Sequence, residues 1–148
     1  MEMKIVVNAE CIIQSVKDDN KFGKKLVQMG VLPGSHLKII RVGFRGSTAE
    51  VMIDQGQNIA LRSKEMAMLN CKLTAIPLSA LSPEKGVKYK IRSFTGGHGF
   101  IQKMKDRNIH LSETFEILKD HPFELETDHG TISVGRGEAE KIIVEPVD

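Results

Sequence analysis

The residues closest to a recognisable binding motif are the glycine-rich stretch Gly96-Gly97-His98-Gly99. A glycine-rich loop that leads into a helix can hold a phosphate with its backbone amides. This stretch lacks the spacing of a phosphate-binding P-loop and its Gly-Lys-Ser/Thr ending. We therefore interpret it as a connection between a strand and a helix, and we keep His98 as a weak candidate for a metal or anion ligand.

Five histidines and two cysteines could in principle bind a metal ion. No pair of them has the CxxC or HxxxH spacing that marks a local metal site. His121 and His129 flank one predicted strand, which at ~3.3 Å per residue separates them by about 20 Å or more. Cys11 and Cys71 are interpreted as small buried hydrophobic residues, and two cysteines predict no disulfide framework. The sequence thus predicts neither a metal site nor a cofactor.

Enzyme chemistry has little support in the sequence. Asp18 and Asp19 could be paired carboxylates, but they precede a predicted helix, where negative charge favours the positive end of the helix dipole. Ser63 is interpreted as a helix cap. No nucleophile lies beside a recognisable base, so we expect a protein that is not an enzyme.

Composition excludes several other classes. The 148 residues carry 21 basic and 19 acidic side chains, a net charge of +2. Nucleic-acid binding usually shows as a strong basic excess on one face, so no nucleic-acid partner is expected. No stretch approaches the ~18 consecutive apolar residues that suggest a membrane span. The apolar run at the start of the chain is too short for the hydrophobic region of a signal peptide. We expect a cytoplasmic protein.

The same unit occurs twice along the chain. A shift of 78 residues places Phe22–Val31 on Phe100–Ile109 and Leu37–Ile40 on Phe115–Leu118, and a shorter shift places Glu65 on Glu138. The Pro- and Ser-rich segment near Pro77 separates the copies, since proline cannot sit inside a central strand. We therefore expect two domains, residues 1–76 and 77–148.

Each copy reads mainly as strands. Val87, Tyr89 and Ile91 alternate with polar residues, the pattern of a strand with one buried face, and Ile12, Gln14 and Val16 do so less cleanly.

A short helix follows in each copy. Asn20 is expected to cap it in the first, and Gly30 or, in the second copy, Asn108 is expected to end it. A turn, a three-stranded meander, a closing helical turn and a final strand complete the unit. Short strands with one small helix predict a mainly β fold of two tandem small β-barrels.

Several segments, in this order, resemble the FeoA family, the ferrous iron transport protein A family. Leu26–Ser35 is similar to its signature segment, and Ile59–Arg62 followed by Glu65 is similar to its last strand and closing turn. In the second copy, Pro77–Leu81 and Glu138–Val144 resemble its opening and its close.

The resemblance implies SH3-like barrels in a cytosolic, non-catalytic accessory protein. Such a protein would act by contact with the cytosolic part of the ferrous iron transporter FeoB. The chain departs from the common form in having two copies. The second copy also has Leu111-Ser112 in place of Pro-Gly, and an inserted Thr95–Gly99 loop.

The same barrel occurs as the C-terminal domain of iron-dependent repressors. Those proteins carry a helix-turn-helix domain upstream, and this sequence contains none, which disfavours a DNA-binding regulator. A small metal- or anion-responsive sensor that uses the His98 loop is the alternative function. Recognition of polyproline peptides would need an aromatic-lined groove, and a chain with no Trp and one Tyr offers few residues for it.

The expected partner surface consists of apolar residues in turns, because turns lie on the surface. These residues are Leu32, Pro33, Phe44 and Leu111. The neighbouring Val31 and Ile109 are expected to pack back on the helix ends as core residues. Two copies in one chain could also be the covalent equivalent of a pair of domains that single-domain proteins form by oligomerisation. A homo-oligomer is therefore left open.

Overall fold

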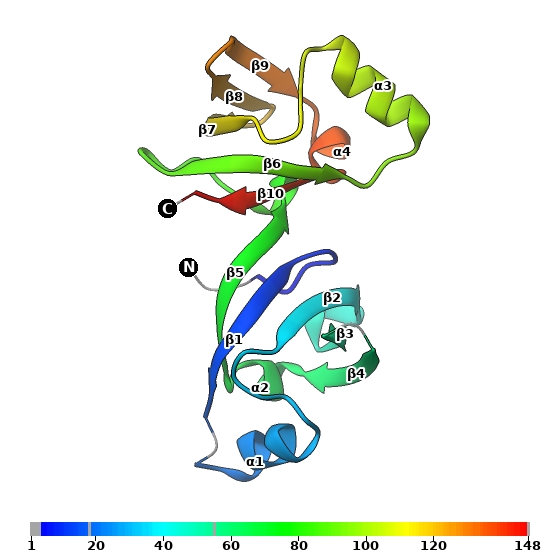
Figure 1. The fold of residues 1–148 in the computed structure, drawn as a ribbon, viewed down its shortest axis with the longest axis vertical. Helices are drawn as coiled ribbons and strands as arrows, with labels where there is room; N and C mark the ends of the chain where they lie inside the picture. The colour runs from blue at the N-terminus through cyan, green and yellow to red at the C-terminus, as the bar shows by residue number, and fades with distance from the viewer. Residues whose placement is uncertain (1–3, 18, 55, 148) are drawn as a thin grey trace. The chain divides into compact units, whose positions relative to one another are not determined.

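Two units of the same element order follow each other along the chain (Figure 1). The structure is a computed structural model and describes residues 4–17, 19–54 and 56–147. The first unit spans Met1–Thr74 and the second spans Ala75–Asp148. Each runs as strand, helix, three-stranded meander, helical turn and strand, as the sequence predicts.

The first unit pairs its strands in the order β4-β3-β2-β1-β5. Its strands are β1 (Glu10–Val16), β2 (His36–Val42), β3 (Thr48–Ile53), β4 (Gln57–Arg62) and the first part of β5 (Leu69–Pro77). Its helices are α1 (Lys21–Gln28), the 3-10 turn η1 (Phe44–Gly46) and α2 (Ser63–Met66). The meander β2-β3-β4 is antiparallel.

The second unit pairs its strands in the order β5-β10-β6-β7-β8-β9, beginning with the last residues of β5. Its strands are β6 (Lys88–Phe94), β7 (Thr114–Asp120), β8 (Phe123–Thr127), β9 (Gly130–Val134) and β10 (Ile142–Pro146). Its helices are the 3-10 turn η2 (Leu78–Ala80), α3 (His98–Asp106) and α4 (Arg136–Ala139).

The prediction of a mainly β fold in two similar units is confirmed, with one correction. The strand order has two ends, so the sheet formed by the described residues is not closed into a barrel. Closure would require the edge strands of a unit to exchange backbone hydrogen bonds. In the first unit the helical turn α2 separates edge strands β4 and β5 along the chain.

The buried face of β1 differs from the predicted one. Cys11 and Ile13 are fully buried, whereas Ile12 is 41% exposed. Cys11 is opposite Leu37 of β2, which is also buried, so the pairing register places Cys11 and Ile13 inward. The sequence could not set this register, because apolar residues occupy three adjacent positions of the strand and fit either face.

Cys11 is fully buried as expected and Cys71 is half-buried, but the prediction that they form no disulfide is wrong. The two cysteines form a disulfide between β1 and β5, which are neighbours in the sheet, with their Cα atoms 5.6 Å apart. They lie 60 residues apart along the sequence, and only the strand order brings them together.

Both ends of α1 and the C-terminal end of α3 follow the sequence prediction. The Asn20 side chain accepts hydrogen bonds from the backbone N–H groups of Phe22 and Gly23, both at 3.0 Å, and so caps α1. Gly30 and Asn108 occupy equivalent positions after α1 and α3, with φ of 89° and 64°. Glycine and asparagine are the residues that most easily take this left-handed conformation. Among the described residues, none of the helices has the length and apolar character needed to span a membrane.

Candidate functional site

The turn between α1 and β2 presents apolar side chains to solvent. The Ser35 amide donates to the Leu32 carbonyl at 3.0 Å, and Gly34 has a φ of 91°, which makes a type II turn with Pro33 in its second position. Leu32 is 46% exposed and Pro33 is also exposed. The predicted turn is thus present, and its tip is a Leu-Pro pair.

The second unit makes the equivalent turn without the Pro-Gly pair. The Glu113 amide lies 3.4 Å from the His110 carbonyl, and Ser112 takes the left-handed conformation with a φ of 68°. The Glu113 carboxylate accepts a hydrogen bond from the His110 amide at 3.2 Å, which holds the two ends of the turn. Leu111, at the position of Pro33, is 54% exposed.

Buried residues fix both turns to the helix that precedes them. The amide of Val31 donates to the Leu26 carbonyl at 3.0 Å, and the amide of Ile109 donates to the Met104 carbonyl at 2.9 Å. Val31 and Ile109 are at most 1% exposed, which confirms that they are core residues. Because these two side chains point inward, the residues that follow them are turned toward solvent.

Phe44 lies apart from Leu32 and Pro33. It belongs to η1 between β2 and β3, is 81% exposed, and has the Arg45 guanidinium 5.0 Å from its ring centre. Leu32 precedes β2 and Phe44 follows it, so the seven residues of β2 separate them. At ~3.3 Å per residue the strand alone is about 20 Å long. The structure therefore gives the first unit two separate apolar tips.

Sequence reasoning missed an ion pair that joins each helix to its closing helical turn. Lys25 Nζ lies 3.5 Å from Glu65 Oε2 in the first unit, and Lys103 Nζ lies 2.8 Å from Glu138 Oε2 in the second. Arg107 Nη1 adds a second contact, 2.9 Å from Glu138 Oε1. The signal was available in the repeat, which places a lysine and a glutamate at equivalent positions in both copies.

Each glutamate also caps its own helical turn. Glu65 Oε1 accepts from the Arg62 amide at 3.0 Å, and Glu138 Oε1 accepts from the Gly135 amide at 2.9 Å. Burial, the largest single influence, raises the pKa of Glu138, but the hydrogen bonds from Lys103, Gly135 and Arg107 together lower its pKa to about 2. Glu138 is thus an anion held by two cations. Ser63, which was predicted to cap the first of these turns, is instead its first helical residue.

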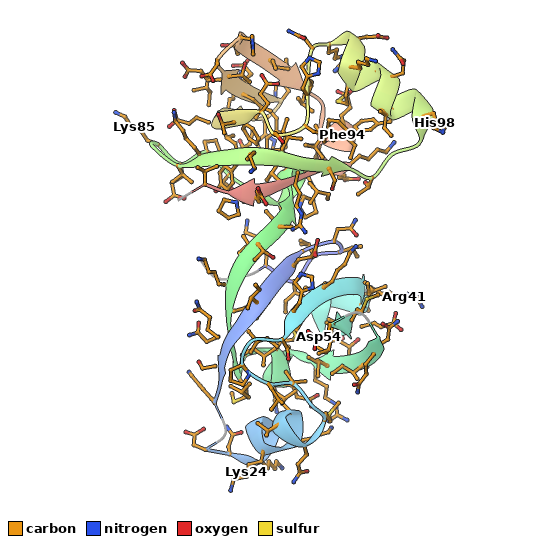
Figure 2. The ribbon with its side chains drawn as sticks, viewed as in Figure 1. Lys24, Arg41, Asp54, Lys85, Phe94 and His98 are labelled. Carbon is orange, nitrogen blue, oxygen red and sulfur yellow. A yellow bond between two sulfur atoms is a disulfide. The ribbon has the colours of Figure 1, made fainter. Side chains whose placement is uncertain are left out.

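The candidate ligands for metal or catalysis are not brought together. His98 is the exposed first residue of α3 (Figure 2). His121 lies in the turn before β8 and His129 in the turn after it, as predicted. In the part of the chain that the structure describes, no group of three or more His, Cys, Asp or Glu side chains could hold a metal ion. Asp18, one of the candidate paired carboxylates, lies outside the described residues.

Comparison with known proteins places this architecture in a family. The model of the FeoA domain matches the chain twice, over residues 4–73 and 76–146. A search of curated proteins finds no match. The solution structure of iron(II) transport protein A from Clostridium thermocellum aligns with a TM-score of 0.58 and 25% identity, over 98% of this chain and 86% of that one.

A crystal structure of an iron uptake regulatory protein (FeoA) aligns with a TM-score of 0.44 and 25% identity, over 49% of this chain and 99% of that one. The two matches of the domain model together extend over nearly the whole chain, one in each copy of the repeat. The chain belongs to the FeoA domain family and carries two copies of the domain in tandem.

Proposed function

We propose that this chain is a non-catalytic accessory protein of ferrous iron uptake that acts in the cytoplasm by contact with the cytosolic part of a FeoB-type transporter. The observation that supports it most is the double match to the FeoA domain. Similarity to iron(II) transport protein A along 98% of the chain supports the same role for the tandem form. The proposed domains are residues 1–76 and 77–148.

The exposed turns after the two helices are the proposed contact surfaces. Leu32 with Pro33 in the first domain and Leu111 in the second are apolar and exposed, and each turn directly follows a buried residue that is hydrogen-bonded to its helix. A preorganised apolar contact loses little conformational freedom on binding, which favours affinity. Phe44 is a further apolar tip of the first domain.

Two contact surfaces in one chain would strengthen a weak interaction. Once the first domain is bound, the linked second domain binds as an intramolecular event at a high effective concentration. The turns differ in chemistry, since the first presents Leu and Pro whereas the second presents a single Leu. We therefore expect the two domains to contribute unequally.

The test is a calorimetric titration of the full chain into the purified cytosolic domain of the cognate FeoB, with GDP and with a GTP analogue. Leu32→Asp and Leu111→Asp each place a charge on one proposed surface. Leu118→Asp is the matched control, because Leu118 is an exposed leucine of β7 with the same 46% exposure as Leu32.

The proposal expects saturable binding in at least one nucleotide state. One or both turn variants should weaken it about tenfold or more, while the control leaves it unchanged. Absence of heat with both nucleotides would contradict the proposed partner. Equal weakening by all three variants would contradict the proposed contact surface but not the proposed partner.

A further inference from the structure

The second domain contains an open groove of about 600 Å³ between helix α3 and the helical turn α4. Phe100 and Lys103 line it from α3, and Lys141, which follows α4, lies with its Nζ atom 5.2 Å from the centre of the Phe100 ring. Three glycines contribute to the lining, namely Gly99, Gly135 and Gly137. The groove is therefore lined by an aromatic ring, by cationic side chains and by stretches of bare backbone.

The first domain has long side chains where the groove has glycines. The repeat places Lys21, Arg62 and Lys64 at the positions of Gly99, Gly135 and Gly137.

The lysines cover the equivalent aromatic ring. Lys21 Nζ lies 5.3 Å from the centre of the Phe22 ring, and Lys64 Nζ lies 6.0 Å from it. In the second domain, a Cβ atom added at Gly99 or at Gly137 would have no neighbour within 4 Å. Loss of side chains at these positions thus opens in one domain a space that the other domain covers.

Positive charge lies on both sides of the groove, from α3 and its C-cap and from the residue that follows α4. The lining contains three cations, Lys103, Arg107 and Lys141, and two carboxylates, Glu138 and Glu140, so its net charge is +1. Glu138 is already shared by Lys103 and Arg107.

Arg107 keeps donors that this pairing does not use. Its hydrogen bond to Glu138 uses Nη1 alone. A guanidinium offers five N–H donors in a planar fork that suits carboxylates and phosphates. Its side chain is 41% exposed, so a ligand can reach it. The equivalent residue of the first domain is Met29, which has no charge.

We propose that the groove between α3 and α4 binds a small oxyanion, a carboxylate or a phosphate group, through Arg107 and Lys103, and that the first domain has no such site. The net charge of the lining is opposite to that of the ligand. The glycine positions leave room for it beside the cations. This site is independent of the proposed transporter contact, because neither Leu32 nor Leu111 lines the groove.

The test is a titration of the full chain with inorganic phosphate and, separately, with citrate. Binding is monitored through the chemical shifts of the backbone amides in NMR spectra, at matched ionic strength. Sodium chloride is the control for general screening of charge. Arg107→Met introduces the residue of the first domain, and Gly137→Gln fills the space at Gly137 with a long side chain that carries no charge. Lys24→Met is the matched control, because Lys24 is an exposed lysine of α1 outside the groove.

Saturable shifts at residues of α3 and α4 with phosphate or with citrate support the proposal, and the anion that saturates identifies the class of ligand. Both groove variants should weaken binding at least tenfold, and the control should not. Gly137→Gln keeps Lys103, Arg107 and Glu138, so it tests the groove even if Arg107→Met unfolds the domain. Shifts that do not saturate, or that persist unchanged in Gly137→Gln, overturn the proposal.

Discussion

Lys103 Nζ lies 2.8 Å from Glu138 Oε2, and this ion pair joins the helix of the second domain to its closing helical turn. The same relation holds in the first domain between Lys25 and Glu65, at 3.5 Å. The lysines are 52% and 57% exposed, whereas the glutamates are only 17% and 3% exposed. Each pair therefore has one partner in solvent and one mostly buried partner.

This asymmetry predicts unequal effects of mutation in the first domain. Glu65→Ala leaves the Arg62 amide without its acceptor and should lower the free energy of unfolding by about 1–3 kcal/mol. Lys25→Ala removes only an exposed partner of the ion pair and should cost about 1 kcal/mol or less. Chemical denaturation of both variants measures the difference. A larger loss for Lys25→Ala would show that the ion pair, and not the cap, stabilises the turn.

The low pKa of Glu138 predicts a pH dependence. A carboxyl group whose pKa is about 2 when folded, and ordinary when unfolded, contributes stability that is fully present above pH ~4.5. That contribution is lost as the pH falls from ~4.5 toward 2. Glu138→Gln should therefore reduce stability at neutral pH and flatten its fall over this window. The measurement is the free energy of unfolding of both proteins as a function of pH. If the two curves run parallel, Glu138 is not a source of the pH dependence.

The disulfide predicts a resistance to alkylation and a loss of stability on reduction. It closes a loop of 60 residues, for which the chain-entropy model gives about 4 kcal/mol. Alkylation of the air-oxidised protein under denaturing, non-reducing conditions should leave its mass unchanged. Cys71→Ser should lower the stability of the first domain to that of the reduced protein. Addition of two alkyl groups without reductant would contradict the disulfide.

The left-handed residue after α1 predicts a specific order of substitutions. A Cβ atom at Gly30 would meet nothing within 4 Å, so backbone strain alone opposes a side chain there. Gly30→Ala should cost about 1–2 kcal/mol, because alanine resists a φ of 89°. Gly30→Asn, which copies Asn108 of the second domain, should cost less. Thermal unfolding gives the order, and equal losses would exclude the conformational explanation.

The repeated unit could be predicted because its signals are local. Asn20 as a cap, Gly30 and Asn108 as helix ends, and the turn at Pro33 each depend on residues close together in sequence, and all are confirmed. The fully buried state of Val31 and Ile109 follows from the same helix ends.

The features that sequence reasoning missed depend on distant residues. The buried face of β1 follows from its pairing with β2, and the disulfide follows from the strand order. The groove could not be predicted because its glycines are far apart in sequence. Only the placement of α3 beside α4 shows that they line the same space. Phe22 and Phe100 are half-buried with lysine ammonium groups over their rings, because long cationic side chains can cover an aromatic ring.

The central claim is that the apolar turns after the two helices contact the FeoB-type transporter. Hydrogen exchange of the full chain, alone and with the cytosolic domain of FeoB, tests this claim most directly. The account predicts slower exchange in the complex at residues 31–35, at residues 109–113, or at both, with unchanged exchange in β8 and β9. Unchanged exchange at both turns under saturating partner would contradict it.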